Sequence, residues 1–149
     1  MELSSRAFDE GGEIPWRFAA PGLNEIPPLE IAEVPENAAS LALILENLDS
    51  PVGALTHWLV WNIPPDTRYI DSVSQPMGWV RGRDAFGKLG YTGPAPPEGR
   101  QRFRFILIAL DCELSLPAGA NRERLDTAIQ GHELERAVLE GYSQRPDEA

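Results

Sequence analysis

Three runs of apolar residues dominate the hydrophobic pattern of the chain. Residues 40–46 are apolar almost throughout, and residues 56–63 form a second such run that ends at two prolines. Residues 102–110 alternate charged and apolar positions at first and then become fully apolar. Short, continuously apolar runs of this kind are typical of strands whose two faces are both covered. The pattern therefore predicts three central, buried β-strands.

The segments around these runs carry different signals. Residues 1–38 and 64–101 are interrupted repeatedly by proline and glycine, which predicts loops with short extended pieces. Residues 47–53 combine turn-forming residue types and predict a tight connection. Residues 122–139 place apolar side chains at helical spacing, so we expect a helix there, divided by Gly131 into two short ones.

Composition and charge narrow the class of protein. The 149 residues include 14 prolines and 13 glycines, which argues against an all-helical bundle and favours one mainly β domain over residues 1–149. The net charge of −10 is opposite to that of a general nucleic-acid binder. No apolar run approaches the ~18 residues of a membrane span, and the N-terminus lacks the pattern of a signal peptide. With Cys112 as its single cysteine, the chain is expected in the reducing cytoplasm.

Most sequence signatures of catalysis and of cofactor binding are missing. The chain has no phosphate-binding glycine loop and no nucleophile elbow, so we expect no cofactor and no catalytic residue. One cysteine and two histidines are too few for a closed zinc site, and we expect no metal. Cys112 directly follows a predicted strand and is interpreted as an ordinary buried or edge thiol.

His57 is the most informative polar residue of the predicted strands. Period-two alternation places it on one strand face with Leu59, Trp61 and Ile63. It fits either a satisfied core histidine or an anion-binding group. If the neighbouring strands lie close together, Asp49 would meet His57 at one edge and favour the charged imidazolium.

Six of the thirteen basic residues fall within residues 81–104, which fits either a solvated face or a positive rim around a phosphate or carboxylate. Gly93 and the prolines after it predict a rigid loop that a ligand can approach closely.

These motifs together resemble the phosphatidylethanolamine-binding protein family, especially its short bacterial and archaeal, Raf-kinase-inhibitor-like members. The segments that carry the resemblance, in chain order, are residues 8–15, 22–24, 27–29, 40–44, 49–51, 56–58, 62–64, 90–99, 102, 105–111, 131–132 and 141–142. The resemblance implies an antiparallel Greek-key β-sandwich with short C-terminal helices and a shallow anion pocket at one edge. It places in that pocket Asn47, Asp49, Ser50, Pro51, His57, Gly93, Ala95, Pro96, Pro97, Gln101 and Phe103, with Arg102 as structural support that pairs with Asp49.

The sequence departs from the family pattern in four places. In the family's acidic loop, Asn47 replaces an aspartate and Leu48 replaces a proline. Further along the chain, Gln101 replaces a histidine and Phe103 replaces a tyrosine. Gln101 still donates hydrogen bonds but cannot become charged.

The sequence thus predicts a non-enzymatic protein that binds a small anion such as phosphate or a phosphorylethanolamine-like head group. The alternative is a protein-binding modulator, because the resemblance implies inhibition of kinases or serine proteases in some members. In that case residues 64–101 would contact the protein partner. A catalytic Asp49–His57 pair is a third hypothesis, and the resemblance to short family members also implies a homodimer.

Overall fold

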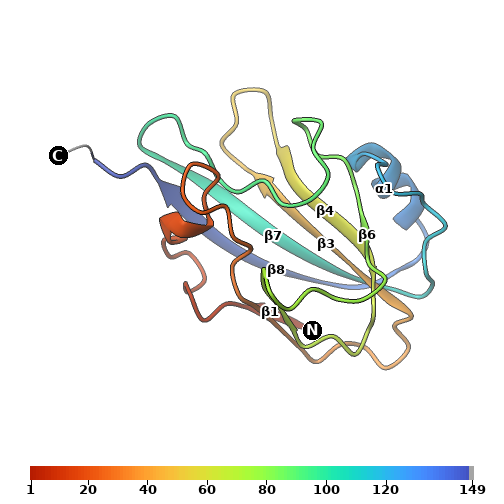
Figure 1. Ribbon diagram of the computed structural model, residues 1–149. Coiled ribbons are helices and arrows are strands. Elements are labelled where there is room, and N and C mark those ends of the chain that lie inside the picture. The colour runs from red at the N-terminus through yellow and green to blue at the C-terminus, as the bar shows by residue number, and fades with distance from the viewer. Residues whose placement is uncertain (148–149) are drawn as a thin grey trace.

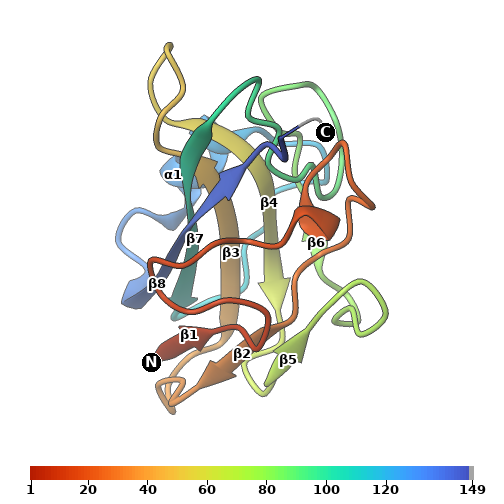
Figure 2. The same cartoon turned by 90° about the vertical axis from the view of Figure 1, so that its left-hand side faces the viewer.

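The computed structural model describes residues 1–147 and shows a mainly β protein with two antiparallel sheets. The small sheet has the strand order β1-β2-β5, and the large sheet has the order β6-β4-β3-β7-β8 (Figures 1 and 2). The elements in chain order are β1 (Glu2–Ser4), the 3-10 helix η1 (Trp16–Phe18), β2 (Leu29–Ala32), β3 (Ser40–Asn47), β4 (Leu55–Ile63), β5 (Tyr69–Ile70), β6 (Val80–Arg81), β7 (Arg100–Leu110), α1 (Arg122–Ile129) and β8 (Glu133–Gln144).

The large sheet is covered on both faces, as the apolar runs predict. All eight residues of β3 are buried. One face packs against the small sheet, through residues such as Leu43, Phe105 and Ile31. The other face packs against α1, where Ile44 and Leu125 belong to a second apolar cluster. Successive side chains of each strand point to opposite faces, so the strands contribute to two separate apolar cores. The three predicted central strands are confirmed as β3, β4 and β7.

The C-terminal region differs from the predicted pair of helices. The single α-helix of residues 1–147 ends at Ile129, and Gly131, with φ of 83°, turns the chain into strand β8. From Ala137 onward every second residue of β8 is buried, while Val138 is 43% exposed. The prediction of a second helix was wrong because β8 hydrogen-bonds along the whole of β7, which would otherwise be an uncovered edge. The Greek-key connectivity stays a prediction.

Strand β4 carries two irregularities that change which face its side chains occupy. In its pairing with β3, Leu45 lies opposite Trp58 and Glu46 lies opposite Thr56, so His57 is an extra residue in a β-bulge. A second register shift includes Asn62, whose φ is 57°. As a result His57 and Ile63 lie on the face of the small sheet, opposite to Leu59 and Trp61. The predicted common face of these residues was wrong, because simple alternation does not include bulges.

The segment of residues 11–14 runs along the outer edge of β8. The amide of Ile14 donates to the carbonyl of Tyr142 (2.7 Å), and the amide of Tyr142 donates to the carbonyl of Gly12 (3.0 Å). The amide of Gly11 also donates to the carbonyl of Glu140 (2.7 Å). The N-terminal region thereby satisfies part of an edge that the large sheet would otherwise present to solvent.

Among residues 1–147, no helix has the length and apolar character needed to cross a membrane.

Candidate functional site

Several of the predicted pocket residues meet at one end of the large sheet. Here β3 ends, β4 and β7 begin, and the long segment between β6 and β7 passes close by (Figures 1 and 2). Asn47 is the last residue of β3 and lies opposite Phe103 of β7 in the strand register. Two residues before Phe103, Gln101 lies on the same face of β7. The bulge of β4 adds His57 to this face, where its ring contacts Phe103 at the same end of the sheet as Asn47 and Gln101.

The ring of His57 is anchored through one nitrogen. It is 3% exposed, and its Nδ1 lies 3.1 Å from the carbonyl oxygens of both Thr92 and Gly93. Carbonyl oxygens only accept hydrogen bonds, so Nδ1 carries a hydrogen and donates it to them. Nε2 is left for another partner: it accepts when the ring is neutral and donates when the ring is charged.

Two aromatic rings flank the imidazole. Phe103 meets it edge-on at a centroid distance of 5.1 Å, and the half-exposed Phe86 meets it edge-on at 4.9 Å. Within residues 1–147, Nε2 of His57 has no hydrogen-bond partner. It is nevertheless not a fully buried atom, and the neighbouring ring of Phe86 is itself half-exposed.

The surroundings of His57 favour its neutral form. Burial lowers the pKa of His57, and this effect outweighs the carbonyls of Thr92 and Gly93 and the negative charge of Asp84. The sequence-based expectation was that Asp49 would favour the imidazolium. That expectation was wrong: the carboxylate that acts on His57 is Asp84, and desolvation is the larger influence.

Two amides form the polar side of the site. Nδ2 of Asn47 donates to Oε1 of Gln101 (3.1 Å), while Oδ1 of Asn47 accepts from the amide of Asp49 (2.8 Å). Both amide oxygens are thus used inside the protein. The NH₂ group of Gln101 and the second N–H of Asn47 remain as donors. An arrangement that uses its acceptors internally and leaves donors free is suited to an anion.

Asp49 is held by Arg102 rather than by His57. Its carboxylate accepts from the amide of Arg102 (2.7 Å) and from Nη2 of the guanidinium (2.9 Å), with Nε at 3.2 Å. The guanidinium and the amide hold the pKa of Asp49 below its ordinary value. The expected pairing of Arg102 with Asp49 is therefore present, and it fixes the loop between β3 and β4 against β7.

Gly93 is required for packing against the protein's own backbone. A Cβ atom at this position would lie 2.1 Å from the carbonyl oxygen of Phe18. The carbonyl of Pro94 accepts from the amide of Ala20 (2.9 Å), and the amide of Gly93 donates to Oδ1 of Asn24 (2.8 Å). The sequence attributed this glycine to close approach of a ligand, whereas the structure shows close approach of residues 18–20.

Two residues that position the site were not predicted as part of it. Asn24 binds the amide of Gly93 and also donates to the carbonyl of Tyr91 (3.2 Å). The buried Asp84 accepts from the amides of Phe86 and Lys88 (both 2.9 Å) and from the hydroxyl of Thr92 (2.8 Å). Asp84 therefore organises the loop that anchors His57. Its position in an irregular, glycine-rich segment gave no periodic signal, although aspartate is a common organiser of such loops.

The remaining predicted pocket residues lie on the two neighbouring loops. Ser50 accepts from the amide of Val52 (3.3 Å), and Pro51 is exposed. Ala95 and Pro97 are exposed, whereas Pro96 is buried and its carbonyl accepts from Nε of Arg145 (2.9 Å). No hydrogen bond joins these five loop residues to His57 in the part of the chain that the structure describes, and their role in binding stays a prediction.

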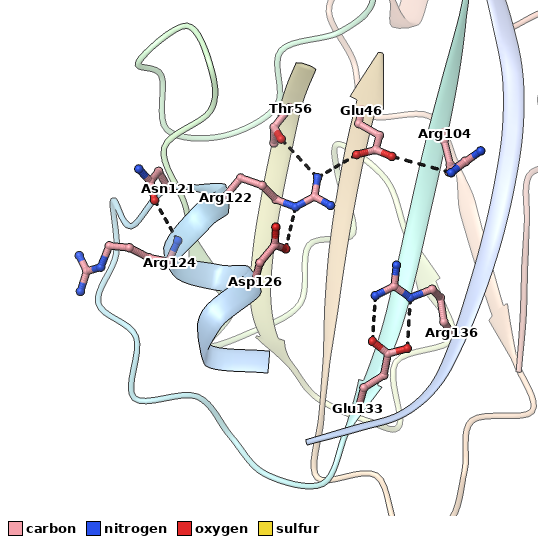
Figure 3. Close-up of polar contacts among 9 residues, drawn as sticks. All are labelled: Glu46, Thr56, Arg104, Asn121, Arg122, Arg124, Asp126, Glu133 and Arg136. Atoms are coloured by element: carbon pink, nitrogen blue, oxygen red, sulfur yellow. Dashed lines mark hydrogen bonds and ion pairs between the residues drawn. The ribbon is translucent and has the colours of Figure 1, made fainter. Parts of the chain in front are cut away.

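A second polar cluster lies on the opposite face of the large sheet (Figure 3). Here the buried Glu46 accepts from Nη1 of Arg122 (2.9 Å), and the same nitrogen lies 3.3 Å from the hydroxyl of Thr56. Nε of Arg122 also donates to Asp126 (2.9 Å), and Arg104 approaches Glu46 at 4.0 Å. These contacts tie α1 to the sheet and place Glu46 on the face opposite to His57.

The basic residues that could have formed a positive rim are instead engaged individually. The guanidinium of Arg100 lies over the ring of Tyr142 at 4.2 Å, and Arg104 lies between Glu46 and Glu140. Arg83 donates to the carbonyl of Gly87 (2.6 Å). Because even-numbered positions of β7 face away from Gln101 and Phe103, its arginines do not converge on the site.

Comparisons with known proteins identify relatives of this chain and structures that share its fold. The family model described as phosphatidylethanolamine-binding protein matches residues 4–144. A UPF0098 protein from Methanothermobacter thermautotrophicus is 43% identical over 150 residues, which is 97% of this chain and 99% of that relative. A crystal structure of a phosphatidylethanolamine-binding protein homolog from Chlamydia trachomatis is 35% identical, covers 97% of each chain and superposes with a TM-score of 0.92. The structure of YbcL from E. coli, at 22% identity over 97% of this chain and 98% of its own, shares the fold with a TM-score of 0.89.

Proposed function

The chain belongs to the phosphatidylethanolamine-binding protein family, and on that premise we propose that it is a non-catalytic protein that binds a small phosphate-bearing anion beside His57. The observation that carries the proposal is the single free nitrogen of His57. Nδ1 is used by the carbonyls of Thr92 and Gly93, so Nε2 is the atom that meets the ligand.

The donors around His57 support an anionic ligand. The NH₂ group of Gln101 and one N–H of Asn47 are free, while both amide oxygens already accept hydrogen bonds. Phe86 and Phe103 give the site apolar walls, which exclude water and strengthen a charge-assisted hydrogen bond. Such a bond contributes about 1.5–3 kcal/mol. This is enough for weak but specific recognition of a phosphate group.

Binding should be linked to protonation of His57. The pKa of His57 is lowered in the free protein, so the ring is neutral near neutral pH and its Nε2 cannot donate. A bound anion beside Nε2 stabilises the imidazolium and raises that pKa. Affinity therefore increases as the pH falls below 7, until the free protein is itself protonated.

The test is a titration of the protein with inorganic phosphate and with phosphorylethanolamine, followed by amide NMR at several pH values. We expect saturable shifts at Asn47, His57, Gly93 and Gln101, with tighter binding at pH 6 than at pH 8. His57→Ala should abolish saturation. His57→Gln keeps a polar group without a titratable charge, so it should bind weakly and show only the pH dependence of the ligand itself. Unchanged affinity in His57→Ala would refute the proposal.

A second candidate function rests on large apolar side chains that the exposed loops carry. Val73 is 92% exposed and Met77 is 89% exposed, and Val52 projects from the loop between β3 and β4. Large apolar side chains on exposed loops are typical of protein-binding surfaces. They favour a protein-binding modulator that uses the segment between β5 and β6.

Inhibition assays against serine proteases and protein kinases separate the two candidates. A modulator should inhibit its target at stoichiometric concentration, and the double substitution Val73→Ser and Met77→Ser should weaken inhibition, whereas His57→Ala should not. No inhibition of any enzyme tested, together with saturable phosphate binding, would leave the anion-binding function alone.

A further inference from the structure

Three metal-ligating side chains meet at the end of β7 opposite to the one that carries Gln101. Asp111 and Cys112 directly follow β7, and His132 lies in the turn between α1 and β8. A carboxylate oxygen, the sulfur and a ring nitrogen of these residues all lie within 4.8 Å of one another. The closest pair is Nδ1 of His132 and Oδ1 of Asp111, at 2.8 Å.

Backbone hydrogen bonds hold the three residues in place. The amide of Asp111 donates to the carbonyl of His132 (3.0 Å), and the amide of His132 donates to the carbonyl of Ile129 (2.9 Å). The hydroxyl of the buried Ser40 donates to the carbonyl of Cys112 (2.7 Å). Since the three ligand atoms already lie within 4.8 Å of one another on this backbone, rotations of the side chains can bring them around one ion.

The ligand types select a class of metal. Thiolate sulfur, imidazole nitrogen and carboxylate oxygen are the three protein ligands of zinc, with ligand distances of about 2.0–2.3 Å. Calcium and magnesium prefer oxygen ligands alone, so a sulfur and a nitrogen ligand argue against them. We propose that Asp111, Cys112 and His132 bind one zinc-like divalent cation, with water in the fourth coordination position.

This site differs from the closed zinc site that the sequence argues against. A closed site needs four protein ligands, whereas three ligands with an open position need only the residues that the fold brings together here. The side chains of Asp111 and His132 are about half exposed, so an ion can reach them from solvent. The net charge of −10 favours the accumulation of cations around the protein.

Metal binding at this site has a distinctive spectroscopic signature. The thiolate is the form of cysteine that binds a metal, so the ion displaces the proton of the Cys112 thiol, which passes to solvent. Cobalt(II) has coordination preferences close to those of zinc, and a cobalt–thiolate bond gives a near-ultraviolet charge-transfer absorption. That absorption reports the sulfur ligand directly.

The test is a titration of the reduced, metal-free, tag-free protein with Co²⁺ and then with Zn²⁺. We expect one equivalent of Co²⁺ to produce the charge-transfer absorption and Zn²⁺ to abolish it by displacement. Cys112→Ser should remove the absorption and weaken Zn²⁺ binding at least tenfold. His132→Ala should weaken binding by a similar factor, whereas His57→Ala should leave the absorption and the affinity unchanged.

Two controls keep the test decisive. Far-ultraviolet circular dichroism and the Tm of metal-free Cys112→Ser test whether the variant is folded. We expect it to fold, because the side chain of Cys112 is only partly buried and serine is nearly isosteric with cysteine. Amide NMR with Zn²⁺ should show shifts confined to the neighbourhood of residues 111–112 and 132. Absence of the charge-transfer absorption, or equal Zn²⁺ affinity in wild type and Cys112→Ser, would overturn the proposal.

Discussion

The substitution Gly93→Ala tests whether the site depends on the close packing of residues 91–94 against residues 18–20. The added Cβ would lie 2.1 Å from the carbonyl oxygen of Phe18, and real Cβ contacts essentially never fall below 3.0 Å. The two backbone segments must therefore separate by about 0.9 Å, from 2.1 Å to at least 3.0 Å. Neither segment can absorb this shift by rotating a side chain, because the clash is between a Cβ and a backbone atom.

The expected cost follows from the contacts at this place. Two hydrogen bonds cross between the segments, from the amide of Ala20 to the carbonyl of Pro94 (2.9 Å) and from the hydroxyl of Tyr91 to the carbonyl of Phe18 (2.7 Å), and a third joins the amide of Gly93 to Asn24 (2.8 Å). Each contributes about 0.5–1.5 kcal/mol, and overpacking costs about 1–3 kcal/mol. Losing one or two of these bonds and adding strain gives a decrease of about 3 kcal/mol in the free energy of unfolding. For a chain of this size this corresponds to a decrease in Tm of about 6–12 °C.

Urea unfolding followed by tryptophan fluorescence measures the change in stability. Gly53→Ala is the matched control, because Gly53 has φ of 95° but a Cβ added there would meet no atom within 4 Å. That control should lose about 1–2 kcal/mol, which is the cost of a left-handed backbone conformation for a residue with a Cβ. Gly93→Ala should also weaken phosphate binding, since the carbonyl of Gly93 anchors His57. A stability within about 0.5 kcal/mol of wild type for Gly93→Ala, on the order of a neutral surface substitution, would refute this account of the packing.

Three further predictions concern charged and polar groups. Glu46→Gln removes the buried charge that Arg122 and Arg104 face. Because both arginines are partly exposed, we expect the free energy of unfolding to decrease by about 2 kcal/mol. Urea unfolding measures this change, with Asp126→Asn as the exposed control. Asp49→Asn removes a group whose pKa is lowered in the folded state. The stabilisation by Asp49 is present above the ordinary carboxyl pKa of about 3.9 and is lost as the pH falls through the lowered value, so the variant should show a flatter decline of Tm in acid. Gln101→His adds an ionisable donor next to Asn47, so phosphate binding should be about fivefold stronger at pH 6 and little changed at pH 8. Calorimetry measures both affinities. Equal affinities of the variant and the wild type at pH 6 would contradict the placement of Gln101 beside the ligand.

The strands of the large sheet could be predicted from the sequence because their signal is local. A strand buried on both faces must be apolar at consecutive positions, and β3 and the second half of β7 show this directly. Strand β8 could not be predicted in this way. Its residues alternate between buried and exposed only from Ala137, and the partner that makes it a strand is β7, more than twenty residues earlier. Helical spacing and strand pairing compete for such a segment, and pairing prevailed.

The candidate site was predictable in part for a similar reason. His57, Asn47 and Gln101 lie at strand ends, so motifs at those positions were enough to group them. The bulge that turns His57 toward Phe103 depends on the pairing of β4 with β3, and the sequence of β4 contains no signal that predicts it. The carboxylate that affects the pKa of His57 is Asp84 rather than Asp49. This could not be predicted, because irregular loops bring residues together in ways that no periodic pattern encodes.

The contact of residues 11–14 with β8 has a consequence for the behaviour of the protein in concentrated solution. An uncovered strand edge is a template for pairing with another chain, and this edge includes the apolar residues Ala137 and Leu139. The N-terminal segment occupies part of it with its own amides and carbonyls, so removing that segment by proteolysis would expose a ready site for edge-to-edge aggregation. We therefore expect a sample that has lost residues 1–14 to self-associate more than the intact protein, which light scattering can measure.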